Sequence, residues 1–192
     1  MVEIARKEGG RSIWRFLGWG TALVLLAAPF VAMRLDADGV DWNAVDFIFA
    51  GLLFAIVGGL LELTVSKVRN GWYRAGAAVA LLANLLVIWS NLAVGIVGSE
   101  RNPANQLFFL ALLVGIAAAA AGRFRAIGMA RAMLASAVSL MIAFVIASTG
   151  ATDEPLVKHV LEFAGTSFFA ALLLTSAWLF RRAARDQSSS SS

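Results

Sequence analysis

The chain has 192 residues, of which 60% are hydrophobic and 15% charged, with no cysteine and one histidine. Soluble proteins average about 45–50% apolar and about 25% charged residues, so both values indicate a membrane protein. Without cysteine, disulfides, iron–sulfur clusters and zinc–thiolate sites are excluded, and a single histidine excludes bis-histidine haem ligation within one chain. We therefore expect no cofactor.

Apolar runs along the chain predict the fold. A membrane span needs about 20 mainly apolar residues, and six runs of this kind lie at residues 13–33, 45–66, 73–97, 106–121, 129–147 and 156–180. We predict an all-α fold, a polytopic transmembrane helical bundle of six spans that forms one domain over residues 1–186. Residues 187–192 are rich in serine and are expected to be a disordered tail.

The distribution of charge predicts the orientation of the spans. If the N-terminus is cytoplasmic, thirteen of the sixteen Lys and Arg residues fall on the cytoplasmic side and most acidic residues fall outside. The positive-inside rule then places both termini in the cytoplasm. Because the basic residues are spread over several segments next to the membrane, they indicate contact with the headgroups of a lipid bilayer and predict no nucleic-acid partner.

The third predicted span carries a stripe of polar and small residues. Asn84 and Asn91 lie seven residues apart, or about 10 Å along one helix face, and Gly95 and Gly98 continue the stripe. An amide in hydrocarbon needs a partner, so this face is expected to meet other helices or a wet cavity. We favour hydrogen bonds between helices, and the alternative is the lining of a solute site.

Two acidic residues lie within predicted spans and are candidate functional groups, because ionisable residues are rare there. Glu62 precedes Lys67 by five residues, and Glu162 lies one helical turn from Lys158. Pairing with these lysines near the membrane surface is the alternative to a functional role.

Acidic residues also gather near the predicted first outer loop, at Asp36, Asp38, Asp41 and Asp46. The segment lacks the EF-hand pattern, because Gly39 stands at the fourth position instead of the sixth and Phe47 stands where a bidentate Glu is required. We interpret it as a solvated loop, with a looser outer cation cluster as the alternative, and we predict no metal site.

The segment before the fourth predicted span reads Asn102-Pro103-Ala104. This short motif occurs twice in water channels, where the two copies converge, but the chain has one copy in a predicted outer loop. We interpret it as a turn, with Asn105 as the N-cap of the following helix.

Two regions of the chain resemble a group of uncharacterised bacterial inner-membrane proteins with six spans. The regions run from Asn91 to Asn105 and from Ser176 to Arg182, and the resemblance extends over most of the chain. It implies a multi-pass protein of the bacterial inner (cytoplasmic) membrane, and it implies no activity.

These observations favour a non-enzymatic integral membrane protein that acts by helix-mediated association, with itself or as an accessory subunit of a membrane complex. The alternative is a small channel or carrier for an ion or polar solute, lined by Asn84 and Asn91. A lipid-acting membrane enzyme is the least favoured function, because the spacing of the outer carboxylates selects no reaction.

Overall fold

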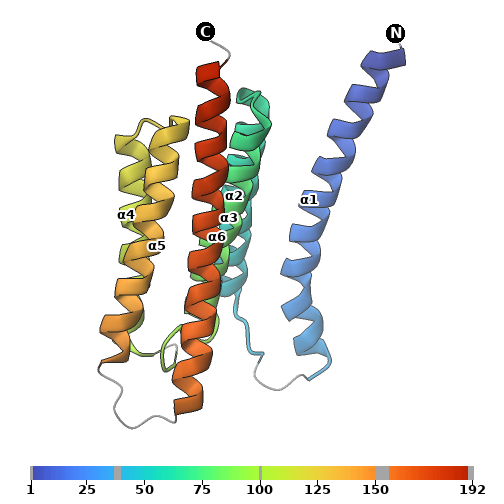
Figure 1. Ribbon diagram of the computed structural model, residues 1–192. Coiled ribbons are helices and arrows are strands. Elements are labelled where there is room, and N and C mark those ends of the chain that lie inside the picture. Colours follow the sequence, from blue (N-terminus) through green and yellow to red (C-terminus); the bar gives the residue numbers. More distant parts are fainter. Residues whose placement is uncertain (1, 37–39, 100, 150–155, 190–192) are drawn as a thin grey trace. The chain divides into compact units, whose positions relative to one another are not determined.

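The computed structural model describes residues 2–36, 40–99, 101–149 and 156–189 (Figure 1). Within these ranges, all side chains are described except those of residues 2–14, 17, 156–158 and 189. Its helices in chain order are α1 (Val2–Arg34), α2 (Ala44–Lys67), α3 (Gly71–Ala93), the 3-10 turn η1 (Pro103–Asn105), α4 (Gln106–Ala121), α5 (Ala126–Ser148) and α6 (Leu156–Ser189). The predicted all-α class is confirmed.

Helix length and hydropathy identify a multi-span membrane protein. Among the described residues, five stretches are long and apolar enough to cross a membrane: Ala44–Lys67, Gly71–Ala93, Pro103–Ala121, Ala126–Ser148 and His159–Ser188. The apolar part of α1 is shorter and covers Gly18–Arg34. The sequence predicts six spans, and the structure gives five long candidate spans and one shorter apolar helix. The predicted orientation of the termini stays a prediction.

Two helices end several residues away from the ends that the sequence predicts. α3 ends at Ala93 instead of residue 97, because Gly95 has a φ of 75°, and this left-handed backbone cannot continue a right-handed helix. α6 extends to Ser189 and has 34 residues, which makes it about 50 Å long, against about 30 Å for the hydrocarbon core of a bilayer. It therefore includes residues 187–189 of the predicted serine tail, and 190–192 lie outside the described residues.

The chain divides into two compact units, residues 1–62 and 63–192. In the first unit, which we call the hairpin unit, Trp19 of α1 lies over Gly58 of α2. A Cβ atom on Gly58 would come within 3.0 Å of the Trp19 ring, so a larger residue would separate the two helices. Ala50 and Leu53 are the buried residues among those described in this unit.

The second unit, which we call the bundle unit, contains α3 to α6. α5 packs against α4 and α6, and α6 packs against α3 as well (Figure 1). Its largest fully buried side chains include Val87, Val97, Phe108, Leu140, Leu173 and Phe180. Small residues bring the helices close together, as membrane packing requires: Gly115 of α4 faces Ser136 of α5, and Gly76 of α3 faces the Phe180 ring of α6.

A single arginine fixes the turn into this bundle. The Arg74 side chain points from α3 back toward the end of α2. Its Nε donates to the Val68 carbonyl at 2.6 Å, and its Nη2 donates to the Val65 carbonyl at 2.7 Å. These are carbonyl groups of the kind that a helix end leaves without partners. Arg74 therefore acts as the C-terminal cap of α2.

Candidate functional site

The connector between α3 and α4, described at residues 94–99 and 101–105, folds back sharply on itself. Gly95 and Gly98 have φ values of 75° and 77°, which L-residues with a Cβ atom rarely adopt. A Cβ on Gly95 would lie 2.5 Å from the backbone of Ser99 and 2.7 Å from Asn105 Nδ2. The connector therefore requires glycine at this position for both conformation and space.

Asn105 holds the connector together from inside. Its Oδ1 accepts the N–H groups of Ile96 at 3.2 Å and Val97 at 3.0 Å. Its Nδ2 donates to the carbonyls of Val97 at 3.2 Å and Ser99 at 2.8 Å. The residue is 4% exposed, so one buried amide satisfies four backbone groups that a membrane protein cannot leave unpaired.

This role of Asn105 differs from the predicted one. Asn105 occupies the N-cap position of α4, but its side chain makes no capping hydrogen bond there. The side chain that caps at this point is Asn102, whose Oδ1 accepts the Ala104 N–H at 3.0 Å and whose Nδ2 donates to the Val97 carbonyl at 3.2 Å. The motif that begins at Asn102 thus forms a turn, as the sequence predicts.

The two amides of the predicted stripe are placed differently. Asn91 is 3% exposed, and its Nδ2 donates to the Asn105 carbonyl at 2.9 Å. Asn91 Oδ1 is buried without a hydrogen-bond partner among the described residues. Asn84 is half-buried, and its Nδ2 donates to the Ala80 carbonyl of its own helix at 2.6 Å. Asn91 therefore belongs to the connector, while Asn84 bonds to its own helix.

Glu162 attaches α6 to the same connector. Its Oε1 accepts the Gly98 N–H at 2.8 Å, its Oε2 lies 3.4 Å from Nδ1 of His159, and its side chain is 9% exposed. The side chain of Lys158, the partner that the sequence suggests, lies outside the described side chains. The structure therefore gathers Asn91, Gly95, Gly98 and Glu162 with Asn102, Asn105 and His159, and we call this group the polar connector.

The other intramembrane acid, Glu62, belongs to the hairpin unit and has different partners from the predicted ones. Arg15 of α1 holds its carboxylate with two hydrogen bonds, Nε to Oε1 at 2.9 Å and Nη2 to Oε2 at 3.0 Å. Trp19 Nε1 donates to Oε1 at 2.8 Å. The sequence suggests Lys67 as the partner of Glu62 because Lys67 is only five residues away along the chain. Arg15 is distant in sequence and comes close to Glu62 only when α1 and α2 pack together.

Three of the four outer acidic residues of the sequence, Asp36, Asp41 and Asp46, lie in the part of the chain that is described. Asp46 lies in the first turn of α2, where it accepts the Asn43 N–H at 2.8 Å while Asn43 Oδ1 accepts the Val45 N–H at 2.7 Å. Asp36 and Asp41 are exposed, and Asp38 lies outside the described residues. Among the described residues, no three His, Asp or Glu side chains are placed to hold a metal ion.

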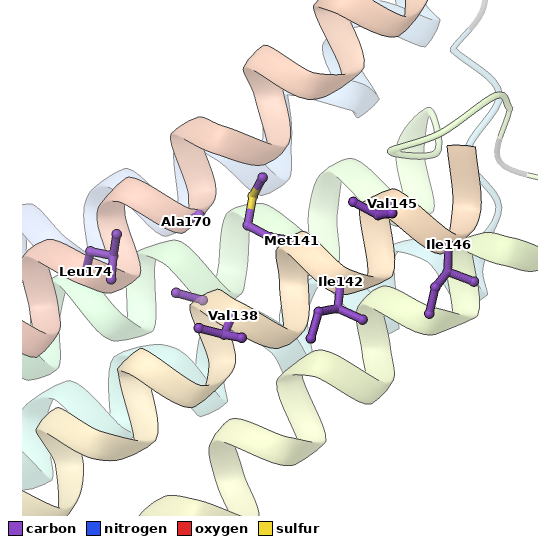
Figure 2. A pocket seen from close by; sticks show the side chains of 8 residues that line it. Val138, Met141, Ile142, Val145, Ile146, Ala170 and Leu174 are labelled. Atoms are coloured by element: carbon purple, nitrogen blue, oxygen red, sulfur yellow. The ribbon is translucent and has the colours of Figure 1, made fainter. Parts of the chain in front are cut away.

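A shallow apolar hollow lies between α5 and α6 (Figure 2). Its lining side chains are Ala137, Val138, Met141, Ile142, Val145, Ile146, Ala170 and Leu174. A hydrocarbon chain fits such a surface, and a polar solute does not, because no lining side chain offers a hydrogen bond. The lining of the hollow therefore offers no polar group that could belong to a functional site together with the polar connector.

No family model, curated protein or solved structure matches this chain. No family is therefore identified, and the bacterial inner membrane implied by the resemblance stays a prediction. The function is therefore inferred from the chemistry and packing of the chain's own residues.

Proposed function

We propose that this protein works without catalysis, by helix-mediated association within the membrane, with a second copy of itself or as an accessory subunit of a larger complex. The observation that carries the proposal is that three polar groups inside candidate spans, Asn84 Nδ2, Asn91 Nδ2 and the Glu62 carboxylate, have partners within the chain. Asn84 bonds to Ala80, Asn91 to Asn105, and Glu62 to Arg15 and Trp19. A path for polar solutes needs such groups to face the path instead.

The hairpin unit offers one surface for such an association. Gly58 and Gly59 are neighbours on α2, but Trp19 covers Gly58, whereas a Cβ on Gly59 would meet nothing within 4 Å. Small residues at such a place let a partner helix approach closely, and van der Waals packing drives helix association in lipid. We expect α2 to be the association helix, with Gly59 at the contact.

Energy transfer between donor-labelled and acceptor-labelled copies in lipid vesicles tests self-association. We expect transfer to fall as lipid dilutes the protein. Gly59→Leu should shift the midpoint by about tenfold, equivalent to about 1.4 kcal/mol, because the leucine side chain holds the two helices apart. Gly165→Leu in α6 is the matched control, since a Cβ at Gly165 also meets nothing within 4 Å. Cross-linking in native membranes tests the accessory-subunit form.

A protein that stays monomeric at every dilution, and that forms no cross-linked complex in native membranes, would contradict association in both forms. Equal effects of Gly59→Leu and Gly165→Leu would remove α2 as the contact.

A channel or carrier is the second candidate, and it is favoured by Asn91 Oδ1, a buried acceptor without a partner among the described residues. A passing solute or water molecule could donate to this atom. Flux through reconstituted vesicles should then be abolished by Asn91→Leu and kept by Asn84→Leu. Flux that is absent from the unaltered protein, or unchanged by Asn91→Leu, rejects this candidate.

A further inference from the structure

The turn between α4 and α5 has an unusual backbone. Two consecutive residues that are not glycine, Arg123 and Phe124, have φ values of 52° and 55°. The Arg123 N–H bonds to the Ala120 carbonyl at 2.9 Å, and the Phe124 N–H bonds to the Ala119 carbonyl at 3.1 Å. This is a Schellman motif, in which the position of Arg123 is usually glycine because a Cβ atom strains the left-handed conformation.

The surroundings of the turn enforce this conformation. Gly122 and Gly128 touch across the turn so closely that a Cβ on either would lie 2.7 Å from the other's Cα. The Tyr73 hydroxyl of α3 donates to the Phe124 carbonyl at 2.7 Å. Strained backbone that its surroundings hold in place is more frequent at functional positions than elsewhere.

The turn exposes three consecutive side chains to its surroundings, an aromatic ring with a cation on either side. Arg123 and Arg125 are exposed, and the Phe124 side chain between them is 59% exposed. The turn joins the ends of two candidate membrane spans, Pro103–Ala121 and Ala126–Ser148. An exposed apolar ring at the end of a span lies at the boundary between the lipid headgroups and the acyl chains.

Further basic and aromatic residues lie at the same end of the bundle unit, which we call the arginine end (upper end in Figure 1). Trp72 of α3 and Trp178 of α6 pack edge to face at 6.0 Å, and the Arg182 guanidinium lies 5.0 Å from the Trp178 ring centre. Over residues 63–76, 118–131 and 178–189, nine Lys and Arg residues accompany a single acidic residue, Asp186. The arginine end therefore attracts anions.

We propose that the Arg123–Phe124–Arg125 turn is a binding site for anionic phospholipids. The two guanidinium groups bind the lipid phosphate, and the Phe124 ring inserts among the upper carbons of the acyl chains. Guanidinium groups bind phosphate with charge-assisted hydrogen bonds. A lipid fits better than an acidic protein segment, because the exposed ring between the arginines is placed where hydrocarbon begins.

Counting of bound lipids by native mass spectrometry tests the site, with dioleoylphosphatidylglycerol and dioleoylphosphatidylcholine added to the purified full chain in detergent. We expect the unaltered protein to bind the anionic lipid more tightly. Arg123→Gly should weaken that binding about fivefold, which equals about 1 kcal/mol, the attraction of one basic residue near an anionic surface. Arg101→Gln is the control, because it removes the same charge from an exposed residue beside the polar connector.

A thermal measurement separates the loss of binding from the loss of fold. Glycine relieves the left-handed strain at position 123, so Arg123→Gly should unfold about 2–4 °C higher in phosphatidylcholine micelles while it binds less phosphatidylglycerol. A variant that is more stable but binds less lipid supports the site.

Three outcomes overturn the proposal. The first is equal affinity of the unaltered protein for the two lipids, and the second is equal weakening by Arg123→Gly and Arg101→Gln. The third is displacement of the lipid by a glutamate-rich peptide or by millimolar inorganic phosphate, which would assign the turn to an acidic protein or to free phosphate.

Discussion

The two ends of the bundle unit solve the same problem with different chemistry. At each end the chain leaves a helix, and backbone N–H and carbonyl groups there need partners outside the regular helical pattern. In the polar connector, the side chain of Asn105 satisfies Ile96, Val97 and Ser99. At the arginine end, backbone hydrogen bonds from Arg123 and Phe124 satisfy Ala120 and Ala119. The connector therefore depends on polar side chains in addition to its left-handed glycines, whereas the arginine end is held by backbone hydrogen bonds and by the absence of a side chain at Gly122 and Gly128.

Loss of Asn105 should break the connector and have the largest effect. Asn105→Leu removes the partners of four backbone groups at once, and each unsatisfied buried group costs about 1–3 kcal/mol. Four groups at this cost give a destabilisation of at least about 4 kcal/mol, measured as unfolding in increasing SDS. Asn105→Asp keeps the acceptor for Ile96 and Val97 but turns a second oxygen toward the Val97 and Ser99 carbonyls. It should lose less than Asn105→Leu only at a pH that protonates the carboxyl group, which can then donate to one of these carbonyls; equal losses at that pH would contradict a role for the acceptor bonds.

Glu162 should matter next, because it fastens the connector to α6. Glu162→Ala leaves the Gly98 N–H without its acceptor, and a hydrogen bond to a charged group contributes about 1.5–3 kcal/mol. Glu162→Gln retains an acceptor oxygen and should lose about half as much in the same unfolding assay. If Glu162→Ala unfolds like the unaltered protein, the Gly98 bond is replaced by water and the connector does not need α6.

The arginine end should respond to added volume instead. Gly128→Ala places a Cβ 2.7 Å from the Gly122 backbone, which cannot move without opening the α4–α5 turn, so we expect a loss of about 1–3 kcal/mol. The control Gly71→Ala adds the same atom where nothing lies within 4 Å. It should be neutral or stabilising by up to about 1 kcal/mol, because alanine favours helix more than glycine does. A stabilised Gly128→Ala variant would show that the close contact is absent.

Asn84 should contribute least, although the sequence pairs it with Asn91. Its amide bonds only to Ala80 of its own helix, and α3 keeps its backbone hydrogen bonds without that contact. Asn84→Ala should therefore change the unfolding free energy by less than about 0.5 kcal/mol, the usual range for a substitution that breaks no contact between helices. A loss above 1 kcal/mol would place Asn84 in a contact with another helix.

The helices could largely be predicted because hydropathy is a local property. The run predicted at 106–121 matches α4, and the run at 129–147 lies within α5. The predictions that fail concern partners. Glu62 binds Arg15 instead of the nearby Lys67, and Asn105 binds the preceding connector instead of capping α4. A left-handed glycine ends α3 early, and glycine alone does not indicate its φ.

The sequence by itself determined that this is an all-α membrane protein, because a span must bury a long apolar run and must satisfy its backbone within the helix. It also identified the polar and acidic residues that need partners. Only the tertiary structure decided which partner each one has, because Asn91 and Asn105, or Gly98 and Glu162, are far apart along the chain. Hydrogen bonds depend on distances of about 3 Å and on direction, and the packing of the helices sets both.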